Sequence, residues 1–333
     1  MKTSQPSKPN KTLVNLALAL GQRLAFGVLV LVFIIFLSHL GLDMARGTDF
    51  QPAAVRAVEK TVAYLGQLMR GDLGLSMAGS ISLLPVSVAE MVPDMLFRSL
   101  GLLFTSLSFA AVVGIILGIW AAKRAHSGWS LIAILASIIG VSVPSFLAAL
   151  LLQLAVIRLT QVMGHAILPV GGFGWDKHII IPALVLAARP LAQITRVTFV
   201  IVSNVLEQDY IRTAHSKGLR QRRVMSRHVI RNAAIAILTT VGLSLRFSLS
   251  SLPVVEFIFG WPGLGFTLLK TIALRDDNLT VALVLCLGIL FILVNILLDF
   301  SYRLIDPRSR ETPEFIKRGE RRNLLEWGQS ALA

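Results

Sequence analysis

The chain has 333 residues, of which 55% are hydrophobic and only 15% are charged, and its mean hydropathy is +0.73. A soluble globular domain carries roughly 25% charged residues, so apolar runs near twenty residues indicate membrane spans rather than buried core. The net charge of +14 does not indicate nucleic-acid binding, because basic residues beside membrane spans stay on the cytoplasmic side during insertion. The single cysteine, Cys286, excludes disulfides within the chain and cysteine-based metal clusters.

We predict an all-α, polytopic membrane protein with six transmembrane helices, at 24–42, 98–122, 130–157, 179–203, 232–256 and 280–302. The first run is too long for a signal-peptide core and has no A-x-A cleavage site after it, which predicts a retained span. With the N-terminus inside, the cytoplasmic segments hold 20 basic residues and the external segments hold 7. This bias predicts that both termini are cytoplasmic.

The predicted organisation has four parts. They are a cytoplasmic N-tail with the first transmembrane helix (1–42), an extracytoplasmic subdomain (43–97), a five-helix permease core (98–302) with a cytoplasmic loop (204–231), and a charged cytoplasmic tail (303–333). The external segment has a weak helical pattern from Val55 to Met69.

Small residues recur every four positions along the second predicted span, at Ala110, Gly114, Gly118 and Ala122. This spacing places them on one helix face, where another backbone can approach closely. Packing against a helix of the same chain is the plainer interpretation, and a contact with another subunit is the alternative.

Several signatures of covalent chemistry are missing from the sequence. It contains no Gly-Lys dipeptide and therefore no phosphate-binding loop of the Walker A type. It has no H-E-x-x-H metal motif and no G-x-S-x-G nucleophile elbow. We therefore predict a chain that is not an enzyme and binds no metal or cofactor. If nucleotide powers its activity, ATP and Mg²⁺ are bound by another polypeptide.

The segment between the fourth and fifth spans is the most informative one. Leu206, Tyr210 and Ala214 lie four apart, which suits one face of a short helix. Gly218 follows the last turn, where glycine readily adopts the left-handed conformation that ends a helix, and Lys217 complements the helix dipole. A second helix is predicted to carry basic residues outward near the lipid headgroups, at Arg222, Arg223, Arg227 and Arg231.

This segment resembles the coupling loop of binding-protein-dependent ABC importer permeases, in their dipeptide/oligopeptide branch. Six segments resemble that branch in the right order: GDLGLS (71–76), SVPSF (142–146), LPVGG (168–172), QDYIRTA with KGL (208–219), VEFIFGWPGLG (255–265) and LIDPR (304–308). The resemblance covers most of residues 22–310 and implies the type I ABC importer permease fold. The Pro-Gly-Asp-Pro run that often follows the first span in this branch is missing from 43–97.

The resemblance implies a set of partners and a mechanism. A second permease completes the solute path through the lipid bilayer, two ABC ATPase subunits drive transport, and an extracytoplasmic binding protein delivers the solute to the permeases. It also implies that a coupling surface docks on an ATPase, formed by Glu207, Asp209, Tyr210, Arg212, Thr213, Ala214, Lys217, Gly218 and Leu219. The alternatives are a solvated or lipid-facing surface for the cations and a simple helix cap for Gly218.

Intramembrane charges are costly and often functional. Arg246 falls in the fifth span where the resembled branch is small or apolar, so we place it on the translocation path with Ser142 and Pro144. The alternative for Arg246 is an interior salt bridge. Asp299, near the cytoplasmic end of the last span, is a candidate partner for one of the arginines within the spans.

The sequence Trp261-Pro262-Gly263 follows the fifth span and is predicted to be an external gate or turn. Tryptophan favours the membrane interface, and Pro-Gly fits the centre of a type II turn. A purely structural turn is the alternative. Glu256, just before it, is expected to anchor the loop rather than to bind a ligand.

The sequence therefore predicts a permease subunit in a bacterial or archaeal cytoplasmic membrane, for peptides or similar small solutes. Nickel chelates, opines and oligosaccharides are alternative cargoes, since the resembled branch also carries them. An ion-coupled secondary transporter is less favoured, because the spans show only scattered arginines and Asp299 rather than an ion-coupling site. A membrane scaffold is the remaining alternative, and it predicts that the 207–219 loop can be altered without loss of uptake.

Overall fold

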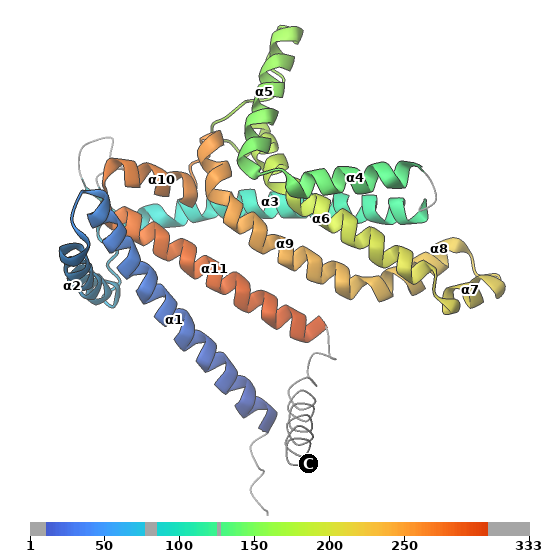
Figure 1. Cartoon of the computed structure of the whole chain (residues 1–333), viewed down its shortest axis with the longest axis horizontal. Coiled ribbons are helices and arrows are strands. Elements are labelled where there is room, and N and C mark those ends of the chain that lie inside the picture. Colours follow the sequence, from blue (N-terminus) through green and yellow to red (C-terminus); the bar gives the residue numbers. More distant parts are fainter. Residues whose placement is uncertain (1–10, 77–84, 125–127, 306–333) are drawn as a thin grey trace, which may run out of the picture. The chain divides into compact units, whose positions relative to one another are not determined.

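A computed structural model of the chain describes residues 11–76, 85–124 and 128–305, which are almost entirely helical (Figure 1). The elements, in order, are α1 (Lys11–Ala45), α2 (Phe50–Leu68), β1 (Leu75–Ser76), β2 (Val86–Ser87), α3 (Val88–Lys123), α4 (Gly128–Ser142), α5 (Ser145–Met163), η1 (Lys177–Ile179), α6 (Ile180–Leu206), α7 (Asp209–Ser216), α8 (Gln221–Val224), η2 (Met225–Val229), α9 (Ile230–Phe259), α10 (Leu264–Leu274) and α11 (Asp277–Ile305). The predicted all-α class is confirmed.

Six helical stretches among the described residues are long and apolar enough to cross a membrane, as predicted. They are Gly21–Ala45, Val88–Lys123, Ser145–Met163, Lys177–Leu206, Gln221–Phe259 and Asp277–Ser301. The fifth is longer than predicted, because α8, the π-helical turn η2 and α9 follow one another as a single helical run of 39 residues. The second cytoplasmic helix predicted around Arg222 and Arg227 is the beginning of this run.

The third predicted span, 130–157, was wrong as a single helix. The helix breaks between Ser142 and Ser145, which gives α4 before the break and α5 after it. Pro144 causes the break: its backbone is extended, with φ −60° and ψ 141°, and it precedes the first residue of α5. A proline has no N–H to donate and disfavours helical geometry at the residue before it, here Val143.

The second span also begins earlier than predicted, at Val88 rather than at residue 98. Glu90, Pro93 and Asp94 made this stretch resemble a loop. Pro93 lies in the second turn of α3, where its missing N–H removes one helical hydrogen bond without ending the helix. Glu90 in the first turn interacts favourably with the helix dipole. The predicted external segment therefore contains the beginning of a transmembrane helix, as well as α2, whose helical pattern is confirmed.

One of two compact units contains the described parts of residues 1–106, 144–186 and 249–292. Its apolar core includes a cluster around Val88, Leu264 and Leu283 and a second cluster around Ile35 and Tyr64. β1 and β2 form a short antiparallel pair in which Leu75 lies opposite Ser87. Helix α2 packs along α1, and the two lie side by side in Figure 1.

The other compact unit contains the described parts of residues 107–143, 187–248 and 293–333. The small-residue stripe of α3 packs against α6 within this unit, as the intramolecular interpretation predicted. A Cβ atom added at Gly118 would lie 2.5 Å from the Cβ of Thr198 and 2.7 Å from the carbonyl oxygen of Thr195. At Gly114 the nearest atom would be the Cγ2 of Ile194, at 3.0 Å. Glycine is therefore required here for close helix packing.

Two predicted parts of the chain lie wholly or partly outside the described residues. They are the beginning of the N-terminal tail and the charged C-terminal tail with most of the LIDPR segment, at 1–10 and 306–333.

Candidate functional site

Helix α7 lies at the centre of the predicted coupling surface, and its two ends have clear local causes. Asp209 occupies the first turn, where a negative charge is favoured by the helix dipole. At the other end Gly218 has φ +72°, the left-handed conformation that glycine adopts without steric cost. The N–H of Gly218 donates to the carbonyl oxygen of His215 at 2.9 Å, and that of Leu219 donates to Ala214 at 3.3 Å. This pair of hydrogen bonds is the Schellman motif. The helix ends just before Gly218, as the sequence predicted.

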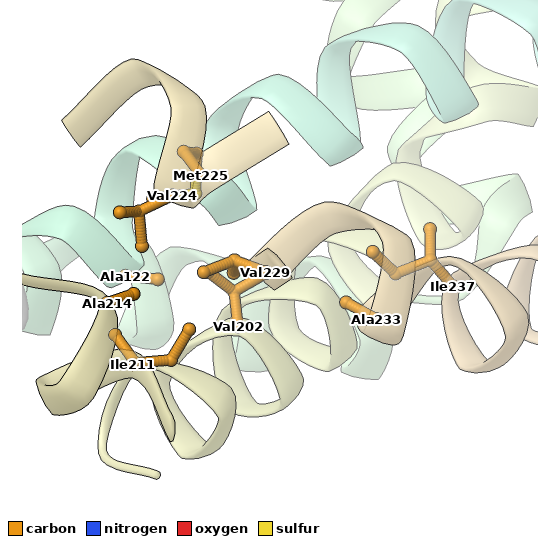
Figure 2. Close-up of a cluster of buried hydrophobic side chains, with 9 residues drawn as sticks. All are labelled: Ala122, Val202, Ile211, Ala214, Val224, Met225, Val229, Ala233 and Ile237. Carbon is orange, nitrogen blue, oxygen red and sulfur yellow. The ribbon is translucent and has the colours of Figure 1, made fainter. Parts of the chain in front are cut away.

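The inner face of α7 is fixed to the rest of its unit by apolar packing. Ile211 is 2% exposed and Ala214 is 6% exposed. Figure 2 shows them in one cluster of buried side chains, whose other members are Ala122, Val202, Val224, Met225, Val229, Ala233 and Ile237. These residues come from α3, α6, α8, η2 and α9. The predicted coupling loop therefore contains a helix that packs against the ends of the membrane helices of its unit.

The outer face of α7 presents polar side chains to solvent. The exposed members of the predicted surface are Glu207, Asp209, Tyr210, Arg212, Thr213, Lys217 and Gly218. Ala214 and Leu219 differ, because Ala214 is buried in the cluster and Leu219 is half-buried against it. These two residues position the surface rather than form its exposed part.

Two contacts further define the outer face. The Tyr210 hydroxyl accepts a hydrogen bond of 3.1 Å from Nδ2 of Asn232, which joins α7 to the beginning of α9. An Nη1 atom of Arg212 lies 3.6 Å from Oδ1 of Asp209, with both side chains largely exposed. An exposed ion pair of this kind contributes roughly 0–1 kcal/mol to stability. Arg212 and Asp209 can therefore separate and pair with groups of a binding partner at little cost.

A groove of about 520 Å³ lies beside α7, where the chain passes from the Gly218 cap into α8. Its lining is strongly basic and consists of Gly218, Leu219, Arg220, Arg222, Arg223 and Ser226. α7 and α8 are in contact, and the view in Figure 1 shows them together at the ends of α6 and α9. The groove is therefore part of the same projection as the predicted coupling surface.

The predicted external turn has a different construction. Trp261 is completely buried, and its Nε1 donates to the carbonyl oxygen of Arg98 at 3.1 Å. Its ring lies 4.8 Å from that of Phe173 and 5.5 Å from that of Trp175, measured between centroids, both nearly edge-on. The residues Trp261, Pro262 and Gly263 are thus fixed to neighbouring segments of their unit, which favours the structural-turn interpretation.

The predicted type II turn at Pro262-Gly263 was wrong. Gly263 has φ −97°, not a positive value, and its N–H donates to the carbonyl oxygen of Trp261 at 2.7 Å. Gly263 is instead the residue that precedes α10, and it is needed for space. A Cβ atom there would lie 2.2 Å from Oε1 of Glu256 and 2.4 Å from Oγ of Ser99.

Those two side chains hold the N-terminus of α10. Oε2 of Glu256 accepts from the N–H groups of Gly265 at 2.7 Å and Phe266 at 3.2 Å. Oε1 accepts from Oγ of Ser99 at 2.5 Å, and the same Oγ accepts from the N–H of Leu264 at 2.7 Å. Glu256 is fully buried, so its carboxylate replaces water for several backbone donors at once. This is the loop anchor that the sequence predicted.

The predicted path residues lie in less distinctive surroundings. Arg246 has its Nη2 3.5 Å from Oδ1 of Asp299, so the expected partnership of Asp299 with an arginine of the spans is confirmed. The Arg189 guanidinium lies 4.6 Å from the ring centroid of Phe247, the residue next to Arg246. Ser142 is exposed and donates to the carbonyl oxygen of Ile138, while Pro144 precedes α5. The salt bridge considered for Arg246 is therefore present, although it is partly exposed rather than interior.

Two anchoring features were not singled out by the sequence reasoning. The four-residue spacing of Leu206, Tyr210 and Ala214 predicted that Tyr210, rather than Ile211, shares a helix face with Ala214. The buried pair is instead Ile211 and Ala214, which lie three residues apart on one helix face. Ser99 was overlooked because its partner Glu256 is 157 residues away in sequence. No local pattern indicates such a pairing.

These features can be set beside known proteins. The family described as the binding-protein-dependent transport system inner membrane component matches residues 114–311, which include the whole α7 projection and the α10 turn. The chain belongs to this family, and it is a multi-pass permease subunit of an ABC importer.

Two relatives illustrate its position in the family. A Brucella abortus (strain 2308) protein named as a peptide transport system permease is 35% identical over 264 residues, covering 76% of this chain and 81% of that protein. The glutathione transport system permease of Pectobacterium atrosepticum is 32% identical over 296 residues, covering 85% and 93%.

The inward-facing methionine ABC transporter MetNI provides a structural relative. One of its chains superposes with a TM-score of 0.51 at 15% identity, covering 66% of this chain and all of that one. This likeness shows the shared permease fold.

Proposed function

We propose that this permease forms half of the translocation path of an ATP-driven importer, and that a separate ATPase drives it by binding the surface of α7 at 207–219. The observation that carries the proposal is the two-sided construction of α7. Its inner face is fixed by Ile211 and Ala214 to an apolar cluster, while its outer face exposes charged and hydrogen-bonding groups.

This construction suits the transmission of force. The Schellman motif fixes the end of α7, and the Tyr210–Asn232 hydrogen bond joins it to the beginning of α9. α9 then continues as a membrane helix. A displacement of α7 by a bound partner would therefore move α9 with it, because packed side chains resist independent sliding.

The chemistry of the outer face supports a protein partner with charged groups of both signs. Glu207 and Asp209 precede Arg212 and Lys217 along the surface, so α7 and the residues that flank it present both acidic and basic groups. Such mixed surfaces fix the register of a complex by charge complementarity more than they increase its affinity. Because the chain belongs to a family of ABC importer permeases, the proposed partner is an ABC ATPase, which would bind ATP and Mg²⁺.

Peptides or similar small solutes are the proposed cargo. Support comes from the names of the Brucella and Pectobacterium relatives, which refer to peptide and glutathione transport. Nickel chelates, opines and oligosaccharides remain the alternatives. The complete importer would contain a second permease, two ATPase subunits and an extracytoplasmic binding protein, in a bacterial or archaeal cytoplasmic membrane.

For the path itself, Ser142, Pro144 and Arg246 remain our proposed contributors. The break at Pro144 supports this assignment, because interrupted membrane helices are tolerated where they border a cavity or other protein. The pairing of Arg246 with Asp299 means that a cargo carboxylate would compete with an existing ion pair.

The test is reconstitution of the tagged chain with its co-purified partners in proteoliposomes, with ATP inside or outside the vesicle. We expect a second permease and P-loop ATPases to co-purify, and labelled dipeptides and tripeptides to enter only when ATP reaches the ATPase side. Uptake that follows an ion gradient without ATP would establish the secondary transporter instead. ATP-driven uptake of an oligosaccharide or nickel chelate, but not of peptides, would overturn the cargo assignment alone.

A further inference from the structure

Helix α2 has three distinct faces, and one of them is an apolar surface with no covering element among the described residues. The face toward the rest of the unit consists of Ala53, Ala57, Thr61 and Tyr64, all buried. On one side of it lie the exposed polar residues Arg56, Glu59, Gln67 and Arg70. On the other side lie exposed apolar residues, here called the apolar flank: Val55, Val58, Val62 and Met69.

The apolar flank is a helical feature and not a chance group. Its members, with half-buried Leu65, recur at alternating intervals of three and four residues. Since each residue of an α-helix advances by about 100°, they fall within a single stripe, and Arg56, Glu59 and Gln67 fall on the opposite side. Exposed Gln51, four residues before Val55, is the polar N-terminal end of the stripe. Exposed fractions of 62% for Val55, 53% for Val58 and 65% for Val62 show that nothing in the described unit covers the stripe.

The flank is continuous with a groove between α2 and α1. The groove has a volume of about 520 Å³ and an apolar lining that includes Leu29, Phe33, Phe36, Val58, Val62 and Leu65. The only hydroxyl in its lining, on Thr61, is already satisfied, because it donates to the carbonyl oxygen of Ala57 at 2.6 Å. The groove therefore offers no hydrogen bond to an occupant.

The depth of the groove follows from α1. Phe33 lies at the middle of the membrane-spanning stretch Gly21–Ala45, twelve residues from its outer end. At about 1.5 Å per residue this places Phe33 roughly 18 Å along the helix, inside a hydrocarbon layer of about 30 Å. Val58 and Val62 line the groove together with Phe33 and Leu29, both more than half exposed. The groove therefore extends from this depth toward the outer end of α1, where Lys60 of α2 pairs with Asp43, two residues from that end. Val58 and Val62, on either side of Lys60, thus lie along the outer half of the hydrocarbon layer, where an apolar surface is favoured and water is not present.

We propose that α2 is embedded in the outer leaflet, with its apolar flank against phospholipid acyl chains, and that one acyl chain occupies the α1–α2 groove. The ion pair of Lys60 Nζ with Asp43 Oδ1, at 2.6 Å, then lies toward the headgroups at the outer end of α1. A helix of another subunit is a poorer occupant. Because an α-helix is about 10 Å wide, a single turn would already require roughly the whole volume of the groove.

Site-directed spin labelling of the full complex in nanodiscs tests the position of α2. The chain has a single cysteine, so Cys286→Ala gives a background in which Val58→Cys and Val62→Cys are labelled, with Glu59→Cys as the matched control on the polar side. In nanodiscs of dioleoyl phosphatidylethanolamine and phosphatidylglycerol, we expect the ratio of oxygen to nickel-chelate accessibility to be several-fold higher at 58 and 62 than at 59. Equal nickel access at all three positions would show that the flank faces water and would overturn the proposal. Low access of both reagents at 58 and 62 alone would show a protein cover and would also overturn it.

Native mass spectrometry tests the groove separately. Val62→Trp fills the groove, whereas Val55→Trp adds the same bulk on the flank at a position that does not line it. Complexes released from the same nanodiscs should lose one retained phospholipid in the first variant and none in the second. Identical numbers of retained phospholipids in both variants and in the unmodified complex would contradict occupation of the groove.

Discussion

Helices α7 and α10 are both short helices fixed at the ends of membrane helices, but different forces hold them. Apolar side chains hold α7, with Ile211 and Ala214 in a cluster, and the polar side chains of its outer face are exposed to solvent. Buried polar groups hold α10, since Glu256 and Ser99 satisfy the backbone donors of its first turn. The helix that we propose to bind the ATPase thus has an exposed polar face, whereas α10 has the backbone donors of its first turn paired with buried side chains.

The difference has an energetic consequence. Truncation of a buried apolar side chain costs stability in proportion to the cavity that remains, so an apolar anchor weakens gradually. Removal of one buried acceptor leaves several donors unsatisfied at once, so a polar anchor fails more abruptly. The following variants measure whether the two helices obey this distinction.

The largest effect is expected for Glu256→Ala. It leaves the N–H groups of Gly265 and Phe266 without their acceptor in a buried site, at a cost of about 1–3 kcal/mol for each unsatisfied group. The thermal unfolding midpoint of the purified complex in detergent should fall strongly. Glu59→Ala, on the exposed side of α2, is the control and should leave the midpoint unchanged. Equal midpoints for the two variants would show that α10 has no polar anchor.

Ile211→Ala should weaken the attachment of α7 by about 2–4 kcal/mol, the range for truncating a buried aliphatic side chain. Amide hydrogen exchange should accelerate across 209–216, and less ATPase should co-purify. His215→Ala, on the exposed face of the same helix, should not change the exchange rates. If both variants exchange like the unmodified protein, the apolar cluster does not hold α7.

Substitutions at Gly218 test the backbone conformation that ends α7 separately from side-chain contacts. A Cβ atom there would meet nothing within 4 Å, so any effect of substitution comes from the positive φ. Gly218→Val should cost about 1–2 kcal/mol and uncouple ATP hydrolysis from uptake, while Gly218→Asn should be much milder because asparagine tolerates this conformation. Both variants should reach the membrane in normal amounts. Normal uptake by Gly218→Val would contradict the role of the cap in docking.

The smallest effect is expected for the Arg246–Asp299 pair, which is only partly buried. A double-mutant cycle with Arg246→Ala and Asp299→Ala should give a coupling free energy of about 0.5–1 kcal/mol in unfolding measurements. Peptide affinity measured in the same variants separates a role of Arg246 in the ion pair from a role in binding cargo on the path. A loss of affinity in Arg246→Ala that Asp299→Ala does not share would support a position on the path.

The sequence was most informative where local chemistry decides structure. Hydropathy runs located six spans, the four-residue repeat of small side chains from Ala110 to Ala122 indicated a close helix contact, and Gly218 marked the end of α7. Each of these depends on neighbours within one or two helical turns. The resemblance of six ordered segments then gave the family, which the match over 114–311 shows.

The sequence was least informative where distant residues meet. The apolar run 130–157 concealed a break because a proline within a membrane helix can kink it or end it, and only the surroundings of Pro144 decide. The role of Gly263 was misjudged for the same reason. Its lack of a side chain makes room for Glu256 and Ser99, which a turn preference cannot reveal.

Site-specific photo-cross-linking from α7 tests the central claim most directly. A photoreactive amino acid replaces Thr213 on the exposed face, and a matched variant carries it at Val62 on the apolar flank of α2, in complexes purified with all their partners. The account predicts that the cross-link from position 213 joins this chain to a P-loop ATPase, and that the one from position 62 does not. A complex that retains its ATPase but gives no such cross-link from position 213 would contradict the proposal that α7 is the coupling helix.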